Sequence, residues 1–600
     1  MNYSLTWDLD SIFPGGTESP QLAVRLDKLA SDIRDLADII KQWEPSGDTP
    51  NFNGLEAILC KAEKIENGFA QTESFITAVQ SADIHNKKAN TLLGVLQSYS
   101  ADYQNVYNEL MKKLTTLTEN GWSQLEKAPL ANQQGVLFNL EELREKGKQL
   151  LTEDEEHIIN QLAIDGFNAW SSHYDTIVAS IEIDYRGEKL SAGQAFNRMT
   201  GDPDAAVREE LFDLWEKNWA DKAPLFADTL NHLQGFRLIN YKLHGIEDYL
   251  ETPLKYNRMK KETLEAMWQA ISANKQTFVD FLTRKAQLFG KEKMAWQDQD
   301  APVILDELEE TRYTFDEAAE FIIGNFDKFS PKMAQFAREA FEKSWIEAED
   351  RPGKRPGGYC TSLPETRESR IFMTYGGSVN EVATLAHELG HAFHSHVMWD
   401  LPGISQQYAM NVAETASTFA ELIVADAALK QAKTNAEKIN LLDSKMQNAI
   451  AMFMNIHARF IFENNFHAER KEKVLSDEEI TQLMLEAQKE AYQDSLEAYH
   501  PHFWASKLHF YIDDVPFYNF PYTFGYLFSM GIYAFAQKSD GNFEENYISL
   551  LQDTASMSTE ELAKKHLGVD LTQPDFWQAG IDIVKQDVEE FMTLTDDHIK

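Results

Sequence analysis

Hydrophobic residues recur at helical spacing over most of the first third of the chain. Apolar positions three and four residues apart run from Leu22 to Gln42 and from Leu55 to Gln80, and similar patterns fill residues 20–165. This spacing gathers the apolar side chains on one face of a helix. The pattern therefore predicts long amphipathic helices and a mainly α fold.

Two stretches depart from this pattern. Residues 176–185 are rich in β-branched residues and predict a strand that ends at Arg186-Gly187, with helix returning from Ser191. We expect a domain boundary near residue 200, with a helical domain over 1–200 and a second domain over 201–600. Between Arg351 and Thr374, Pro, Gly and Thr replace the helical pattern, and residues 370–375 predict an extended segment in a small sheet.

Gly376 and Gly377 follow that extended segment and precede a new helix. An edge strand here would let an extended peptide add main-chain hydrogen bonds, and the two glycines would allow its backbone to come close. A simple strand-to-helix turn explains them equally well. Ser378 and Glu381 then form a capping-box pattern, and Pro402-Gly403 supplies a stop.

The helix between these signals contains the sequence His387-Glu388-Leu389-Gly390-His391. Two imidazoles four residues apart lie on one helix face and can bind one zinc ion, and the glutamate between them can act as a general base. Gly390 removes a side chain where a substrate or a neighbouring backbone needs room.

A catalytic zinc ion usually takes three protein ligands, so a third must come from elsewhere. The extended pattern with a third histidine fails, because His394 and Val397 occupy the positions that it requires. Glu414 begins a small, apolar, helix-compatible run, and we favour it over Glu421 or another carboxylate. Glu421 is two turns further along the same face, where it would hold a ligand imidazole by its other N–H or form an ordinary salt bridge.

Two further histidines follow the motif. One helix cannot easily bring three successive imidazoles to one tetrahedral ion, so we interpret His394 as a packed residue or a residue that supports the ligands. His396 points elsewhere and is interpreted as packing. Tyr518, Tyr522 and Tyr526 recur every four residues and align on one helix face if the helix starts near Pro521. Aromatic side chains spaced in this way more often pack in a hydrophobic core than take part in catalysis.

Residues 515–537 carry no formal charge and are long enough to cross a bilayer. Two prolines and many polar side chains argue against that interpretation and favour a buried helix beside a wet cavity. A net charge of −40 makes nucleic acid an improbable partner. Cys60 and Cys360 do not suggest a disulfide framework, and no signal peptide is visible, so we expect a cytoplasmic protein.

Residues 375–394, followed by V-A-E-T-A-S-T-F-A-E at 412–421, resemble the M3 metallopeptidases, and specifically their oligoendopeptidase F branch. The resemblance continues in the segments 7–9, 357–360, 509–511 and 516–518. It implies a multi-helical, zincin-type metallopeptidase with a small β-sheet next to the metal helix and a deep substrate channel. One wall of that channel would come from residues 1–200, and 201–600 would form the catalytic domain.

The resemblance also implies that the enzyme cleaves short peptides internally. It implies one zinc ion per chain, held by His387, His391 and Glu414, with Glu388 as the base that activates water. By the same resemblance, His509, Tyr522 and Tyr526 would stabilise the transition state. Tyr518, Gly376 and Gly377 would contact the peptide.

Two other functions remain open at this stage. A zinc exopeptidase or dipeptidase would use the same chemistry at a chain end. A peptide-binding helical protein would use zinc only structurally, although such sites are usually closed by four protein ligands. The sequence leaves the cleavage preference and the oligomeric state undetermined.

Overall fold

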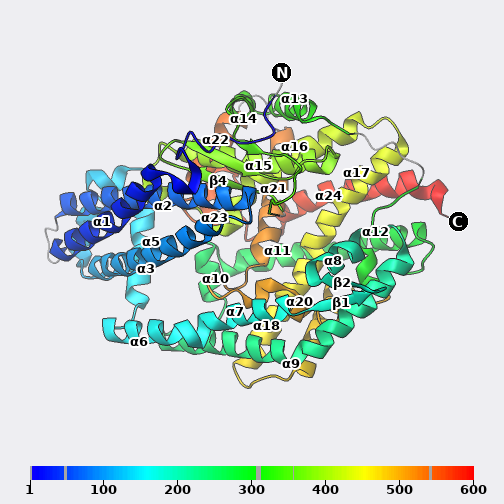
Figure 1. Ribbon diagram of the computed structural model, residues 1–600, viewed down its shortest axis with the longest axis horizontal. Coiled ribbons are helices and arrows are strands. Elements are labelled where there is room, and N and C mark those ends of the chain that lie inside the picture. Colours follow the sequence, from blue (N-terminus) through cyan, green and yellow to red (C-terminus); the bar gives the residue numbers. More distant parts are fainter. Residues whose placement is uncertain (1–2, 46–50, 306–311, 356, 539–542, 600) are drawn as a thin grey trace. The chain divides into compact units, whose positions relative to one another are not determined.

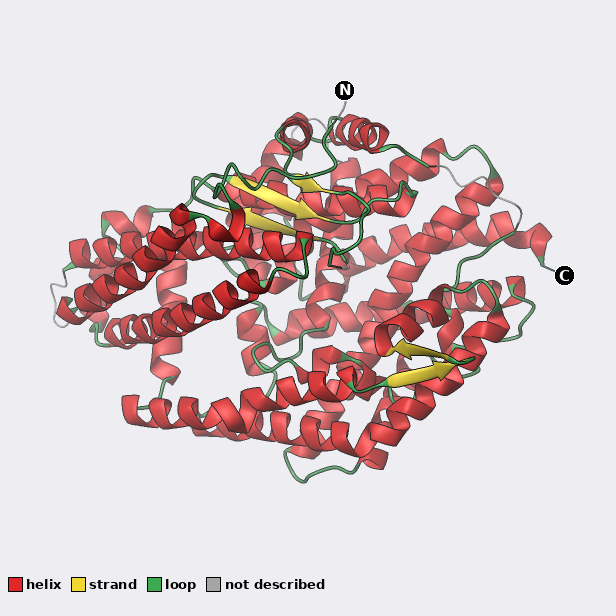
Figure 2. Ribbon diagram, viewed as in Figure 1, coloured by secondary structure: helices red, strands yellow, loops and turns green. Residues whose placement is uncertain are grey.

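The computed structural model describes residues 3–45, 51–305, 312–355, 357–538 and 543–599. Helices dominate these ranges, and strands β1–β5 are short (Figure 2). The mainly α fold predicted from the apolar spacing is confirmed. No helix within the described ranges combines the length and apolarity that a bilayer crossing requires.

The chain forms two compact units, each built from three separate stretches. Unit 1 comprises Met1–Leu150, Glu310–Ala427 and Phe535–Gly568, and unit 2 comprises Leu151–Glu309, Ala428–Ala534 and Val569–Lys600. The division into 1–200 and 201–600 stays a prediction, as does the deep channel.

Unit 1 contains the helices that surround the predicted metal motif (Figure 1). Its elements are α1 (Pro20–Gln42), α2 (Phe52–Ala82), α3 (Lys87–Thr115), α4 (Glu119–Leu125), α5 (Val136–Gln149), α13 (Phe315–Phe326), α14 (Pro331–Glu342), β3 (Ile346–Glu347), β4 (Tyr359–Leu363), β5 (Glu368–Phe372), α15 (Val379–Met398), α22 (Phe543–Asp553) and α23 (Thr559–Leu567), with most of α16 (Met410–Gln431). Helices α1 and α2 match the two apolar patterns of the first third.

Unit 2 contains the remaining helices and a β-hairpin. Its elements are α6 (Glu153–Ala163), α7 (Ala169–Ala179), β1 (Glu182–Tyr185), β2 (Glu188–Ser191), α8 (Ala192–Gly201), α9 (Ala205–Leu243), α10 (Glu251–Tyr256), α11 (Lys261–Ala273), α12 (Lys275–Leu288), α17 (Asn435–Ile450), α18 (Ile456–Arg470), α19 (Asp477–Ala491), α20 (Phe503–Ser506) and α24 (Pro574–Thr595), with most of α21 (Phe520–Lys538). Pro521 lies in the first turn of α21, so the helix starts where the tyrosine pattern required. Tyr518 lies before the helix, however, and only Tyr522 and Tyr526 belong to it.

The strand predicted over residues 176–185 is only half right. Thr176 to Ala179 belong to α7, and β1 begins at Glu182. Tyr174 and Ile177, three residues apart, are both buried in the unit 2 core. Packing of that helical face against α9 therefore outweighs the β propensity of the sequence.

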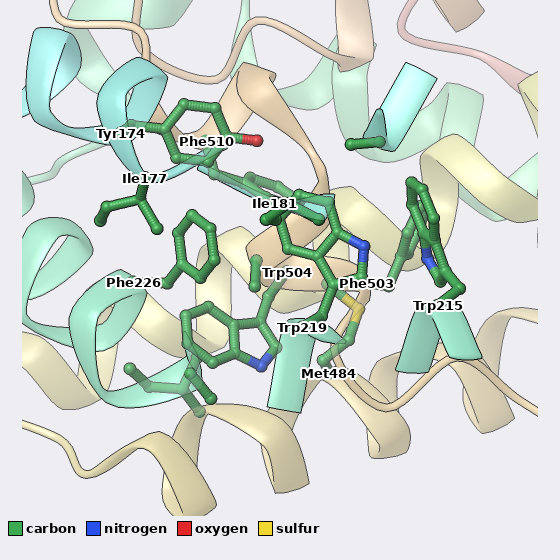
Figure 3. Packing of buried hydrophobic residues seen from close by; sticks show 14 of the residues in the cluster. Tyr174, Ile177, Ile181, Trp215, Trp219, Phe226, Met484, Phe503, Trp504 and Phe510 are labelled. Atoms are coloured by element: carbon green, nitrogen blue, oxygen red, sulfur yellow. The ribbon is translucent and has the colours of Figure 1, made fainter. Parts of the chain in front are cut away.

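The unit 2 core is rich in tryptophan and other aromatic residues. Trp219 and Trp504 are almost fully buried, and Phe226 packs between Trp219 and Tyr174 at centroid distances of 5.2 and 5.5 Å (Figure 3). Unit 1 has two apolar clusters of its own, formed mainly by α1, α2, α3 and α5.

A three-stranded sheet in unit 1 directly precedes the motif helix. Its order is β3-β5-β4, with β3 parallel and β4 antiparallel to β5. Helix α15 packs against β4 and β5, and β4 is labelled next to it in Figure 1. The small sheet expected before the metal helix is therefore present, and β4 is an edge strand in it.

Candidate active site

Helix α15 begins at a complete capping box. The Ser378 hydroxyl accepts a hydrogen bond from the Glu381 backbone N–H at 3.3 Å, and the Glu381 carboxylate accepts one from the Ser378 N–H at 2.8 Å. These bonds satisfy two of the orphan donors at the helix start. The helix then runs to Met398, so the motif lies within a continuous, largely buried helix.

Gly376 and Gly377 make contacts that belong to the turn before this helix. The Gly376 N–H donates to Glu381 at 3.0 Å, and the Gly377 carbonyl accepts from the Tyr313 N–H at 2.9 Å. Gly377 has φ +96°, and a Cβ there would lie 2.8 Å from the Tyr313 carbonyl oxygen. The positive φ and this close approach explain the glycine without a substrate. Contact between these glycines and a peptide stays a prediction.

The two motif imidazoles converge on Glu414, which α16 brings to the side of α15. Nε2 of His387 lies 3.3 Å from Oε2 of Glu414, and Nε2 of His391 lies 3.5 Å from the same oxygen. One donor atom from each of the three residues lies within 4.8 Å of the others. Ligands bound tetrahedrally at zinc distances are about 3.3–3.4 Å apart. The spacing and the N, N, O donor chemistry therefore fit a zinc ion.

Glu421 lies two turns after Glu414 on α16 and contacts the outer nitrogen of His387. Nδ1 of His387 and Oε2 of Glu421 are 3.1 Å apart. Because a carboxylate only accepts, Nδ1 carries a proton toward Glu421, and this contact fixes the ring so that Nε2 faces Glu414. The contacts with Glu414 and Glu421 outweigh burial and raise the pKa of His387 above its usual range.

Helices α15 and α16 touch through their backbones at Gly390. A Cβ at this position would lie 2.5 Å from the carbonyl oxygen of Ala416 and 2.6 Å from Cα of Ser417. Of the two reasons considered for this glycine, the structure shows the neighbouring backbone. The absence of a side chain lets Glu414 come within reach of the imidazoles.

Glu388 is 7% exposed and lines a cavity of ≈ 400 Å³ together with His387, His391 and part of β4. Burial raises the pKa of Glu388 to about 7, with Glu414 and Glu421 adding to the effect and His387 opposing it. Burial also lowers the pKa of His391 to about 4, so this imidazole is neutral at pH 7. Two imidazoles and the Glu414 carboxylate converge, and Glu388 and Glu421 lie near them, so the site favours a cation.

His394, one turn after His391 on α15, makes its contacts with residues other than Glu414. It is fully buried and stacks on Tyr408 with a centroid distance of 4.1 Å and an interplanar angle of 5°. Its Nε2 lies 2.9 Å from the Thr554 hydroxyl and 3.2 Å from the Leu551 carbonyl. His396, on the exposed side of the helix, packs against Phe336 at 4.7 Å.

The predicted donors near the C-terminus belong to unit 2. There the ring of His509 lies 5.3 Å from that of Tyr518 and 6.4 Å from that of Tyr522. Tyr526 instead packs edge-on against Phe453 at 5.6 Å. Burial, with help from Arg459, lowers the pKa of His509 to about 4. Unit 2 therefore groups His509 with Tyr518 and Tyr522.

Several lining residues of the metal cavity were not singled out from the sequence as site residues. They include Tyr408, from the loop before α16, and Ser395, one turn after His391. Ser395 shares the helix face of His391 by the same i, i+4 rule that relates the ligands, so that signal was available. Tyr408 carries no comparable signal in its spacing.

The fold and the site define a helical metallopeptidase, and comparison with known proteins agrees. The model of peptidase family M3 matches residues 198–583, and a model described as Oligopeptidase F matches residues 108–183. The chain therefore belongs to peptidase family M3, a family of metalloendopeptidases. The resemblance inferred from the motif segments is confirmed.

The relatives extend over most of the chain at low identity. Oligopeptidase PepF of Bacillus subtilis is 21% identical over 470 residues, which cover 76% of this chain and 68% of the relative. The crystal structure of a Chlamydophila abortus protein matches with a TM-score of 0.81 at 20% identity, covering 98% of both chains. Oligoendopeptidase-F from Enterococcus faecium matches with a TM-score of 0.69 at 16% identity, over 96% of this chain and 99% of that one. The structural matches show a shared fold.

Proposed function

We propose that this chain is a zinc-dependent endopeptidase that hydrolyses internal bonds of short peptides. The observation that carries the proposal is the convergence of His387 Nε2, His391 Nε2 and Glu414 Oε2, with Glu388 on the wall of the same cavity. Three protein donors leave one tetrahedral position for a reactant, which is the arrangement of catalytic and not structural zinc sites.

His387, His391 and Glu414 would hold one zinc ion per chain. When bound there, the ion would act as a Lewis acid that polarises a carbonyl and makes water a stronger nucleophile. Glu421 orients His387 through the Nδ1 contact, which keeps Nε2 directed at Glu414 and the ion.

Glu388 is the proton carrier in this proposal. Its carboxylate accepts a proton from the attacking water and then donates it to the leaving amine. The side chain is 7% exposed and lines the cavity of ≈ 400 Å³, so its carboxylate can reach a water held there. A Cβ on Gly358, just before β4, would lie 3.8 Å from Oε1 of Glu388, so the strand passes close to the proton carrier.

The peptide would lie along β4, because this edge strand lines the cavity from Gly358 to Ser362. Main-chain hydrogen bonds to such a strand bind a peptide with little dependence on its side chains. Tyr518, Gly376 and Gly377 are proposed as further peptide contacts. For His509, Tyr522 and Tyr526 we propose donation to the negative charge that develops on the carbonyl oxygen.

Metal content and product mapping on one peptide test the proposal. The peptide is blocked at both termini and internally quenched, and it is assayed before chelation, after chelation and after zinc restoration. Internal cleavage that disappears and returns with zinc is the expected result. Bound zinc without cleavage would overturn the enzymatic role, and cleavage only of peptides with a free terminus would replace it with an exopeptidase.

A further inference from the structure

A second cavity of ≈ 230 Å³ adjoins the metal cavity within unit 1. The two cavities share three lining residues, namely Ser362, Ser395 and Tyr408. The metal cavity lies toward the start of β4, and the second one lies toward its end, at Ser362 and Pro364. Both therefore follow the same edge strand.

The shared residues form an ordered rim between the cavities. The hydroxyls of Ser362 and Ser395 are 2.8 Å apart, which joins β4 to α15 by a hydrogen bond. The Tyr408 ring is held by its stack on His394, and its hydroxyl is hydrogen-bonded to Ser395. These contacts fix the side chains of the rim, and Ser395 lies one helical turn after the proposed ligand His391.

The walls of the second cavity combine apolar and acidic chemistry. Met398 and Trp399, at the end of α15, supply apolar surface, and α2 supplies Glu66. No lysine or arginine stands among the described residues that line this cavity. Its volume is that of roughly seven or eight water molecules, enough for one long side chain and too small for a folded segment.

One of the two carboxylate oxygens of Glu66 accepts a hydrogen bond, and the other accepts none from the described residues. Its Oε1 accepts a hydrogen bond from the Tyr103 hydroxyl at 2.7 Å, and Oε2 has no donor among the described residues. Burial raises the pKa of Glu66, the Tyr103 hydrogen bond lowers it, and the nearby Glu63 raises it again. A cationic group in the cavity would use the free oxygen and stabilise the ionised carboxylate.

We propose that the second cavity is a side-chain subsite that selects an arginine or lysine of the peptide, with the alkyl stem against Trp399 and the cation paired with Glu66. The inference rests on the proposed function, because a peptide on β4 is what brings a side chain past the shared rim. Such a side chain matches the cavity in volume, in its apolar stem and in charge.

The test compares arginine with citrulline, which has the same shape without the charge. Doubly blocked, quenched peptides carry one or the other at each position around the scissile bond. We expect one position at which kcat/KM favours arginine by at least about tenfold in the wild type and by less than about twofold in Glu66→Gln. Glu56→Gln removes the same charge from an exposed position of α2 and should keep the wild-type ratio.

A second variant and a binding readout keep the test decisive. Ala70→Leu fills the cavity from α2 with a good helix former, and it should remove the arginine preference by occupying the space. Binding of the same peptides to zinc-loaded Glu388→Gln, with and without Glu66→Gln, measures the preference without turnover. Cleavage with no position that favours arginine, or a ratio that survives Glu66→Gln, would overturn the subsite and leave the peptidase intact. If the peptides are neither cleaved nor bound, both the subsite and the proposed peptidase function are overturned.

Discussion

His387 and Glu421 are joined across two helices by a 3.1 Å contact between Nδ1 of the imidazole and Oε2 of the carboxylate. The contact places a proton on Nδ1 and directs the other nitrogen, 3.3 Å from Glu414, toward the predicted metal position. We expect Glu421 to set the orientation of His387 without itself binding the metal.

Replacing Glu421 by alanine should weaken zinc binding by about 10–100-fold, because His387 loses the acceptor that orients it. Titration against a chelator of known affinity measures the effect. Glu421→Gln keeps an acceptor oxygen, so its zinc affinity should lie between those of the wild type and Glu421→Ala. Asp400→Asn, an exposed change just past α15, is the control. Equal zinc affinity in wild type and Glu421→Ala would contradict this role.

Replacing Glu414 by alanine removes an oxygen from the donor set and should lower zinc affinity by more than the ~10–100-fold expected for Glu421→Ala. Metal analysis after dialysis against a weak chelator shows the difference. The thermal midpoint of both proteins in excess chelator checks that the fold survives. Full zinc retention in Glu414→Ala would move the third ligand to another carboxylate, with Glu421 the first to examine.

Replacing Glu388 by glutamine should leave zinc content at the wild-type level and reduce turnover by about 10²–10⁴-fold, because an amide cannot carry the proton. Zinc analysis and steady-state rates on one preparation separate the two effects. Near-normal turnover with full zinc would assign the proton transfer to another group.

Replacing Gly390 by alanine should destabilise unit 1 by about 1–3 kcal/mol, although alanine favours a helix by about 1 kcal/mol. The added Cβ would meet the backbone of α16 at 2.5 Å, and backbone atoms cannot swing aside. Gly324→Ala is the matched control, since this helical glycine of α13 has nothing within 4 Å of its Cβ position. Urea transition midpoints compare the two. If both variants gained stability alike, the close approach would be wrong.

Acid should destabilise the metal-free protein partly through His394. Burial lowers the pKa of His394 to about 3, and Nδ1 has no partner among the described residues. The neutral ring therefore stabilises the fold fully above the unfolded pKa of about 6.5, and the contribution is lost as the pH falls toward 3. Between pH 7.5 and 5.0 the wild type should lose about 2 kcal/mol more than His394→Gln. Urea unfolding in chelator measures this, with the exposed His85→Gln as control.

Local spacing predicted the motif helix well, because its signals lie within a few residues of one another. Ser378 and Glu381 mark its start, and the i, i+4 relation of His387 and His391 follows from helix geometry alone. Glu414 is a weaker inference from sequence, since its place beside the imidazoles depends on two backbones meeting at Gly390.

Other features depend on contacts that no local pattern encodes. The β propensity of Thr176–Ala179 lost to helix packing around Ile177. Tyr408 reaches the metal cavity through a loop, and Glu66 reaches the second cavity from α2, far earlier in the chain than β4 and α15. The sequence pattern also did not reveal that each unit is built from three separate stretches, because apolar spacing identifies helices and strands but not which of them pack together.

The three-part construction of unit 1 also governs when the site is completed during synthesis. Its first part is released from the ribosome before any of the predicted metal ligands exist. Its third part, Phe535–Gly568, which contains α22 and the Thr554 contact to His394, is made last of the three. At a synthesis rate of about 5–20 residues per second, tens of seconds pass between the synthesis of the early helices and that of the last helices they pack with. For that interval their apolar faces are open to chaperones and to wrong partners. A chain cut short before Phe535 would carry every predicted metal ligand and still lack helices α22 and α23, which complete unit 1.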